Sequence, residues 1–203
     1  MRNDSRLSRA GFVPAGLALA LTLAACQTVP VAPAPSVAWS VRRPVLQNLS
    51  RFGLNGRVAV AVGNQGFNAG LRWTQSGAAT SLTLTGPLGA GGVQVTADGG
   101  NLSVVTSNGK HLGDTQARAE LQDKLGFEPP LTSLRYWVLG VPDPTTAASV
   151  QLDPQQRLTS LTQGGWQVDY ESYMPVGAEW LPRLMTLRRE GVRVRMVVDG
   201  WQL

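Results

Sequence analysis

The sequence predicts a mainly β domain of about eleven antiparallel strands with a few short helices. From Gly53 onward, apolar side chains recur at every second position along most of the chain, which is the period of a strand with one buried face. Glycine occurs 23 times and charged residues make up only 15% of the chain, a composition typical of turn-rich β proteins. Helical spacing is confined to roughly 30 residues, which are too few for a helical bundle.

The first strands are expected to form an antiparallel hairpin followed by a meander. Apolar residues alternate with small or polar ones over 54–62 and, after a Gly-Asn-Gln-Gly turn at 63–66, again over 67–73. Gly-rich turns separate the strands that follow. These later strands are marked by the pairs Leu82 and Leu84, Val93 and Val95, and Leu102 and Val104.

Near-helical spacing of apolar residues predicts three helices. Pro44 suits the first turn of a helix, so we expect the first helix over 44–51. The other two are expected over 115–125 and, after a Pro-Pro pair, over 131–138. These two helices would interrupt the sheet.

The sheet then resumes with five strands. In the last of them, valines and Met196 alternate with Arg193 and Arg195, so one face is apolar and the other meets water. A strongly curved sheet needs apolar cover on its concave side, and few helical residues are available to provide it. The sheet therefore either collapses on itself or encloses a cavity. The five strands are predicted over 149–153, 158–163, 166–173, 181–188 and 192–199.

The N-terminal residues have the features of a bacterial lipoprotein signal peptide. Three arginines precede an apolar stretch at 11–23, which is too short to span a bilayer but suits a secretory signal. The chain's only cysteine, Cys26, follows Leu-Ala-Ala and completes a lipobox. We therefore expect cleavage after Ala25 and covalent N-acyl and S-diacylglycerol lipid on Cys26. The alternative is an ordinary signal peptide with a chance cysteine.

The residues around the lipobox also predict a location and a domain organisation. Gln27 follows the cysteine, and in the sorting rule that this arrangement resembles, a residue other than Asp there favours the outer membrane. Residues 1–25 are expected to be the signal peptide, and 26–38 the lipidated cysteine with a Pro-rich tether. Such a tether could extend about 30 Å in polyproline geometry. Residues 39–203 would form a single domain on the periplasmic face of that membrane.

The charge of the chain argues against a nucleic-acid partner. Removal of the signal peptide leaves 15 basic and 12 acidic residues, a formal charge of +3. The basic residues are scattered and do not form a run interleaved with aromatic residues. Six tryptophans supply large apolar surfaces that suit a core or a cavity.

The sequence offers little for catalysis, so we expect no enzyme activity. The single histidine, His111, lies in an apparent strand, where a surface or edge position is expected rather than a catalytic base. No phosphate-binding loop, dinucleotide motif or metal-ligand cluster is present in the sequence, so no cofactor is expected. A glycosidase pair stays possible from Asp153, Asp169, Glu171 and Glu179, because sequence spacing does not give their distance in space.

The Gly-rich loop at 86–92 carries one large apolar residue, Leu88. A hairpin tip normally holds polar residues. The pattern alone leaves two options: Leu88 folds back on the core, or it forms an exposed hydrophobic tip.

The chain resembles the LolB family, the outer-membrane receptors of the lipoprotein-sorting pathway, over nearly its full mature length. The order and spacing of several short stretches carry the resemblance. They are Phe-Gly-Leu-Asn-Gly-Arg at 52–57, Phe-Asn-Ala at 67–69 with Trp73 and Gln75, 82–89 with Pro-Leu-Gly, Leu-Arg-Tyr-Trp-Val-Leu-Gly-Val-Pro at 134–142, 152–153, 157–158, Gly-Trp at 165–166 with Val168 and Tyr170, Leu-Pro at 181–182, and Trp201.

This resemblance implies an unclosed, strongly curved eleven-stranded barrel with a helical lid over an apolar cavity that accepts acyl chains. Its implied partners are acylated lipoprotein cargo, a periplasmic LolA-type carrier and outer-membrane lipid, with transfer that needs no nucleotide. Leu88 matches the family's protruding-loop leucine, whose implied role is membrane contact. The residues that the resemblance places around the cavity are Trp39, Leu46, Leu71, Trp73, Leu82, Leu84 and Trp137.

Three other functions stay open at this stage. A soluble carrier of the same fold would lack the lipobox. A structural or assembly-accessory outer-membrane lipoprotein would share the anchor but need no cavity and no role in acyl-chain transfer. A surface hydrolase would need convergent polar groups, with Glu171 as the residue to test.

Overall fold

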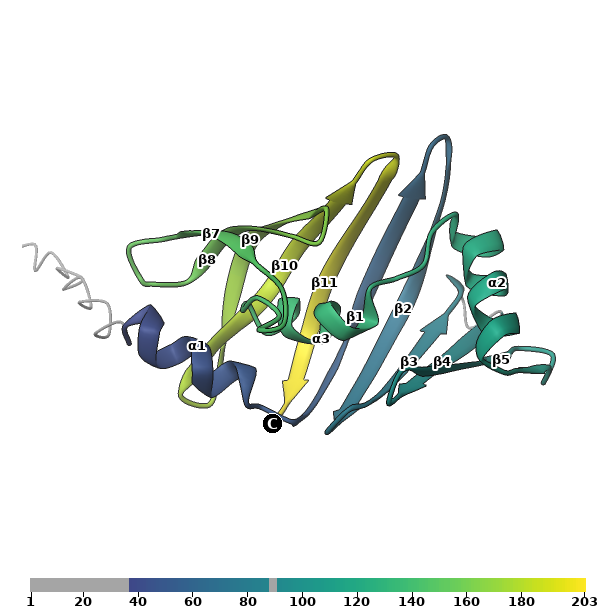
Figure 1. The fold of residues 1–203 in the computed structure, drawn as a ribbon, viewed down its shortest axis with the longest axis horizontal. Helices are drawn as coiled ribbons and strands as arrows, with labels where there is room; N and C mark the ends of the chain where they lie inside the picture. Colours follow the sequence, from purple (N-terminus) through teal and green to yellow (C-terminus); the bar gives the residue numbers. More distant parts are fainter. Residues whose placement is uncertain (1–36, 88–90) are drawn as a thin grey trace, which may run out of the picture. The chain divides into compact units, whose positions relative to one another are not determined.

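The computed structural model describes residues 37–87 and 91–203. Its eleven strands form one antiparallel sheet in the order β6-β5-β4-β3-β2-β1-β11-β10-β9-β8-β7 (Figure 1). The sheet begins at β6 and ends at β7, so it curves without closing, and the predicted mainly β, unclosed fold is confirmed. The strands are β1 (Arg51–Val62), β2 (Gln65–Ser76), β3 (Ala79–Thr85), β4 (Gly92–Asp98), β5 (Asn101–Thr106), β6 (His111–Leu112), β7 (Ala148–Leu152), β8 (Leu158–Gln163), β9 (Trp166–Val176), β10 (Glu179–Arg189) and β11 (Val192–Gln202).

The first and last strands meet at the centre of the sheet. β1 pairs with β2 along its whole length and with β11 on its other side, which joins the two halves of the sheet. The β1–β11 register shifts between Asn55 and Gly56, where a β-bulge bends the sheet. A Cβ at Gly56 would lie 2.1 Å from the carbonyl oxygen of Val197, so only glycine fits this close approach.

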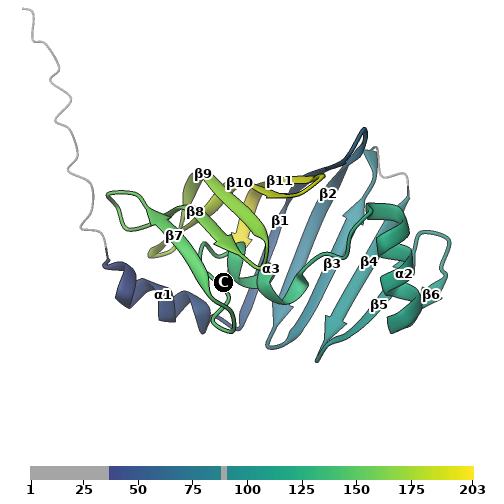
Figure 2. The same ribbon diagram turned by 45° about the horizontal axis from the view of Figure 1, so that its top comes forward.

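Two helices lie against one face of the sheet. Helix α2 (Asp114–Leu125) packs beside β5, and α3 (Leu131–Trp137) lies in front of the central strands (Figures 1 and 2). α2 ends at Gly126, which has the left-handed conformation with φ of 73° that favours glycine at a helix C-terminus. The sequence predicted both helices with nearly these bounds.

The first helix differs from its prediction. Helix α1 spans Trp39–Gln47, not 44–51, and Pro44 lies inside it. The expectation treated Pro44 as an N-terminal residue, but the helix is held by side chains that it buries, Arg42 and Leu46. The Arg42 guanidinium lies 3.1 Å from the Glu179 carboxylate on β10. This tertiary ion pair offsets the cost of the backbone hydrogen bond that Pro44 cannot donate inside the helix.

Several predicted features fall outside the described residues. They are the signal peptide at 1–25, the lipidation site Cys26, most of the tether, and Leu88. Among the helices that the structure describes, none is long and apolar enough to cross a membrane.

Candidate functional site

An apolar cavity of about 100 Å³ lies between the sheet and helices α2 and α3. Strands from both halves of the sheet contribute to it, with Val58 and Val60 from β1, Leu187 from β10 and Met196 from β11. Every residue that lines it is apolar: aliphatic, aromatic, proline or methionine. Such a site can hold an apolar group but offers it no hydrogen bond.

Four of the predicted cavity residues lie together in this wall. Leu71 and Trp73 on β2 line the cavity, and so do Leu82 and Leu84 on β3. The register pairs Leu71 with Leu84 and Trp73 with Leu82, so alternate positions of two neighbouring strands form one apolar surface.

The other three predicted cavity residues do not line it. Trp137 is 1% exposed and packs its ring 6.4 Å from that of Trp166, and Leu46 is 2% exposed in the core. Trp39 lines a separate surface groove with Arg43 and Gln47 on α1. The family resemblance, and not a sequence pattern, placed these three residues at the cavity, and their contact with an acyl chain stays a prediction.

The segment between α2 and α3 also lines the cavity, although its sequence did not predict this. Phe127, Pro129 and Pro130 line the cavity, and the Phe127 ring lies 5.6 Å from that of Trp166. An irregular segment has no periodicity that would reveal which way its side chains point. The Pro-Pro pair was the only available signal, and it was interpreted as a helix boundary.

The indole N–H of Trp73 has its hydrogen-bond partner within the protein, so it is not available to a ligand. Its Nε1 donates to Oε1 of Gln75 at 3.1 Å, and the same oxygen accepts from the Thr80 hydroxyl at 2.7 Å. Gln75 is 2% exposed, and its Nε2 donates to the carbonyl of Gly77. The cavity therefore meets only the apolar part of the indole.

A buried glutamine fixes the C-terminal end of α3. Oε1 of Gln163 accepts from Trp137 Nε1 at 2.8 Å, and its Nε2 donates to the carbonyls of Asp143 and Thr146, each at 2.8 Å. The Tyr170 hydroxyl donates to the Trp137 carbonyl at 2.9 Å, and burial raises the pKa of this hydroxyl well above its usual value. These bonds hold α3 firmly on β8 and β9.

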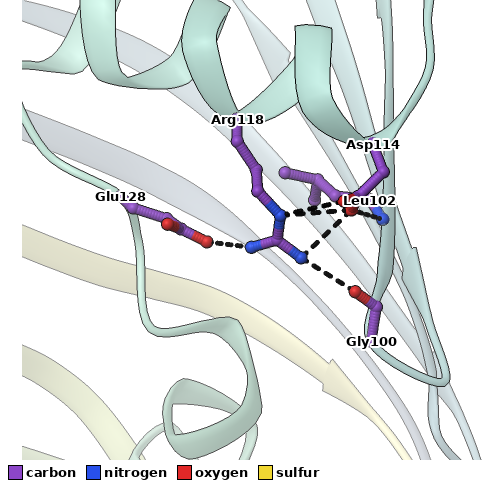
Figure 3. Close-up of polar contacts among 5 residues, drawn as sticks. All are labelled: Gly100, Leu102, Asp114, Arg118 and Glu128. Atoms are coloured by element: carbon purple, nitrogen blue, oxygen red, sulfur yellow. Dashed lines mark hydrogen bonds and ion pairs between the residues drawn. The ribbon is translucent and has the colours of Figure 1, made fainter.

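An arginine ties α2 to its surroundings (Figure 3). Arg118 Nε donates to both carboxylate oxygens of Asp114 at 3.2 Å, its Nη1 pairs with Glu128, and its Nη2 donates to the Gly100 carbonyl at 2.8 Å. Asp114 also accepts from the Leu102 amide at 2.9 Å. The hydrogen bond from Arg118, with that from Leu102, lowers the pKa of Asp114. The network joins α2, β5 and the segment that covers the cavity.

None of the residues considered for catalysis lines the apolar cavity. Each carboxylate considered for a glycosidase pair is in an ion pair with an arginine: Asp153 with Arg157, Asp169 with Arg188, Glu171 with Arg195 and Glu179 with Arg42. His111 is exposed on the edge strand β6. Within 37–87 and 91–203, no group of three or more His, Cys, Asp or Glu side chains could hold a metal ion.

Residues 50–201 match the family model described as Outer membrane lipoprotein LolB. The chain belongs to the LolB family. The matched range contains helices α2 and α3, all of the sheet except Gln202 and the entire cavity wall.

Curated relatives agree with this assignment to the LolB family. The outer-membrane lipoprotein LolB of Pseudomonas savastanoi pv. phaseolicola is 34% identical over 164 residues, which cover 81% of this chain and 80% of the relative. That of Nitrosomonas europaea is 36% identical over 153 residues, covering 74% and 72%. The resemblance recognised in the sequence is thus confirmed, and the chain is a member of a family of outer-membrane lipoproteins.

A solved structure supports the fold alone. A LolA superfamily protein from Nitrosomonas europaea aligns with a TM-score of 0.52 at 10% identity, covering 83% of this chain and 94% of that one. At this identity the likeness extends to the curved sheet and its helices, and not to a function.

Proposed function

We propose that this protein is an outer-membrane receptor that accepts acylated lipoproteins from a periplasmic LolA-type carrier and inserts them into the membrane. The observation that carries the proposal is the all-apolar cavity between the sheet and helices α2 and α3, in a chain of the LolB family. No covalent bond changes in such a transfer. Direction can come from increasing affinity along the path from carrier to receptor to bilayer, without nucleotide and without catalysis.

The physical need for such a receptor follows from the cost of exposing acyl chains. Moving an acyl chain into water costs about 0.8 kcal/mol per CH₂, so one sixteen-carbon chain costs on the order of 12 kcal/mol. A lipoprotein with three such chains cannot cross the periplasm by free diffusion. An apolar cavity that encloses the chains lowers this cost at each transfer step.

The cavity must enlarge to hold an acyl chain. Its volume of about 100 Å³ is below the roughly 300–1,000 Å³ of typical small-molecule pockets. The end of α3 is fixed by Gln163, whereas the segment with Phe127 and Pro129 is tied to α2 by the exposed Arg118–Glu128 ion pair and packs Phe127 against Trp166. Outward movement of this segment is the simplest way to admit a chain.

The anchor and the membrane contact are part of the same proposal. N-acyl and S-diacylglycerol lipid on Cys26 would confine the receptor to the periplasmic face of the outer membrane, and the tether at 26–38 would let the domain at 39–203 reach incoming carriers. Leu88, in the loop between β3 and β4, is proposed to touch the bilayer during release of the cargo.

The deciding experiment follows the cargo. A triacylated lipoprotein bound to its periplasmic carrier is mixed with the mature chain carrying Cys26→Ser, and the partners are separated after incubation without nucleotide. Lipoprotein recovered with this chain supports the receptor function. Lipoprotein that stays on a carrier known to release it to other acceptors would instead favour a structural outer-membrane lipoprotein.

A further inference from the structure

A second, larger groove opens beside the apolar cavity. It has a volume of about 420 Å³ and lies between the β2–β3 and β4–β5 turns, α2 and α3. The two spaces share four residues of their walls, so they are separated only by the side chains of one short segment and of α2. The shared residues are Leu121, Pro129, Pro130 and Leu131.

The groove differs from the cavity in its chemistry. Its walls include the polar residues Thr80, Thr132 and Ser133, together with charged residues that the cavity lacks entirely. One wall is the Arg118–Glu128 ion pair (Figure 3). An apolar cavity that continues into a polar groove matches a ligand with an apolar part and a polar head.

Arg135 is the groove residue with unused hydrogen-bonding capacity. Its Nη1 donates to the Gly77 carbonyl at 2.9 Å, and its guanidinium lies 4.8 Å from the centre of the Tyr136 ring. Its Nε is shielded from solvent and has no hydrogen-bond partner among the described residues. A buried donor without an acceptor is costly and uncommon, so this position suits an acceptor that arrives with a ligand.

The charges of the groove indicate what kind of head it suits. The lining contains two arginines, Arg118 and Arg135, and two carboxylates, Asp98 and Glu128, so the formal charges of the lining residues cancel. Arg118 is already committed to Asp114 and Glu128. A groove of zero net charge gives no advantage to a phosphate and favours a neutral group rich in carbonyl oxygens.

We propose that this groove binds the neutral ester and amide head of the cargo's acylated N-terminal cysteine, while the acyl chains occupy the adjacent cavity. The inference rests on the proposed function and adds a recognition site for the part of the cargo that is common to all triacylated lipoproteins. Arg135 donates from Nε to a carbonyl oxygen of that head once movement of the Pro129–Leu131 segment uncovers this atom. The acyl chains displace the Pro129–Leu131 segment on entry, which brings the two spaces together around one ligand.

The test separates head recognition from cavity filling. The mature chain with Cys26→Ser is titrated with two ligands: a synthetic triacylated cysteinyl peptide, and the neutral apolar probe N-phenyl-1-naphthylamine, which has no such head. We expect Arg135→Met to weaken peptide binding roughly tenfold or more, as for loss of one hydrogen bond to a charged group, with probe binding unchanged. Arg183→Met, at an exposed position of β10, is the matched control and should change neither affinity.

The remaining outcomes are also decisive. An equal loss for peptide and probe, or no loss for either, overturns the head site, whereas failure of the wild-type chain to bind both ligands overturns the proposed function itself. Dipalmitoyl phosphatidylglycerol is titrated in parallel, and an equal dependence on Arg135 would assign the groove to membrane lipid. If Arg135→Met does not fold, the Arg135 Nε–H resonance of the wild-type chain must shift on peptide binding and not on probe binding.

Discussion

Arg118 on helix α2 forms an ion pair with Glu128, in the segment that joins α2 to α3. The same guanidinium contacts Asp114 and the Gly100 carbonyl, so one side chain connects three parts of the chain at the edge of the cavity. The segment beside Glu128 contributes Phe127 and Pro129 to the cavity wall. A polar contact at the surface is thus next in sequence to apolar residues of the cavity wall.

Removal of this contact should ease entry to the cavity. We expect Arg118→Ala to increase the rate at which N-phenyl-1-naphthylamine binds several-fold, because the segment with Glu128 loses its tie to α2 and β5. Stopped-flow fluorescence measures this rate. Arg57→Ala removes a comparably exposed ion pair, with Asp199 on the other side of the sheet, and should leave the rate unchanged. Equal rates in the two variants would show that the network does not restrain the cavity wall.

The network should also respond to acid. Arg118 lowers the pKa of Asp114 in the folded protein, so the carboxylate contributes stability above the usual aspartate pKa of about 3.9. That contribution is lost as the pH falls through the lowered pKa of the folded state. We expect the difference in unfolding free energy between wild type and Asp114→Asn to be constant near neutral pH and to shrink below about pH 4. Denaturant titrations at several pH values measure it, and a difference that grows in acid would contradict the assignment.

The Gln163 network makes a separate prediction about stability. Gln163 is 2% exposed and bonds Trp137, Asp143 and Thr146, so Gln163→Ala leaves buried polar groups without partners. We expect a loss of about 1–3 kcal/mol in unfolding free energy, seen in urea as a lower midpoint with an unchanged slope. Gln167→Ala, at an exposed position of β9, is the control and should change the midpoint little. A small effect at Gln163 would mean that water or a shifted chain replaces its bonds.

The strands could be predicted from the sequence because a two-residue period is a local property. Leu71 and Trp73 share a face of one strand, and Leu82 and Leu84 share a face of the next, whichever way the sheet curves. Once the two strands pair, these four residues must form one surface. The prediction of this part of the wall therefore needed only the hairpin register.

The parts that could not be predicted depend on contacts between distant residues. Arg42 and Glu179 are 137 positions apart, and their pairing sets where α1 lies. Trp137 donates to Gln163, 26 positions away, and is buried in the core. The cavity residue Phe127 lies in an irregular segment without periodicity. Each of these positions is decided by tertiary packing and not by local spacing.

The apolar character of the cavity can be tested at Leu84. This half-buried side chain lines the cavity beside its cross-strand neighbour Leu71. Leu84→Asn therefore places an amide where the wall offers no hydrogen-bond partner. We expect roughly tenfold weaker binding of N-phenyl-1-naphthylamine at equilibrium. The reason is that the bound probe would displace water from the amide, which then has no hydrogen-bond partner. Leu84→Met keeps the wall apolar and should bind nearly as wild type does. Thr83→Asn, the next position on β3 and on the opposite face, controls for the added amide. If Leu84→Asn and Thr83→Asn bind the probe equally well, the probe occupies another site and the cavity is not the place where apolar ligands bind.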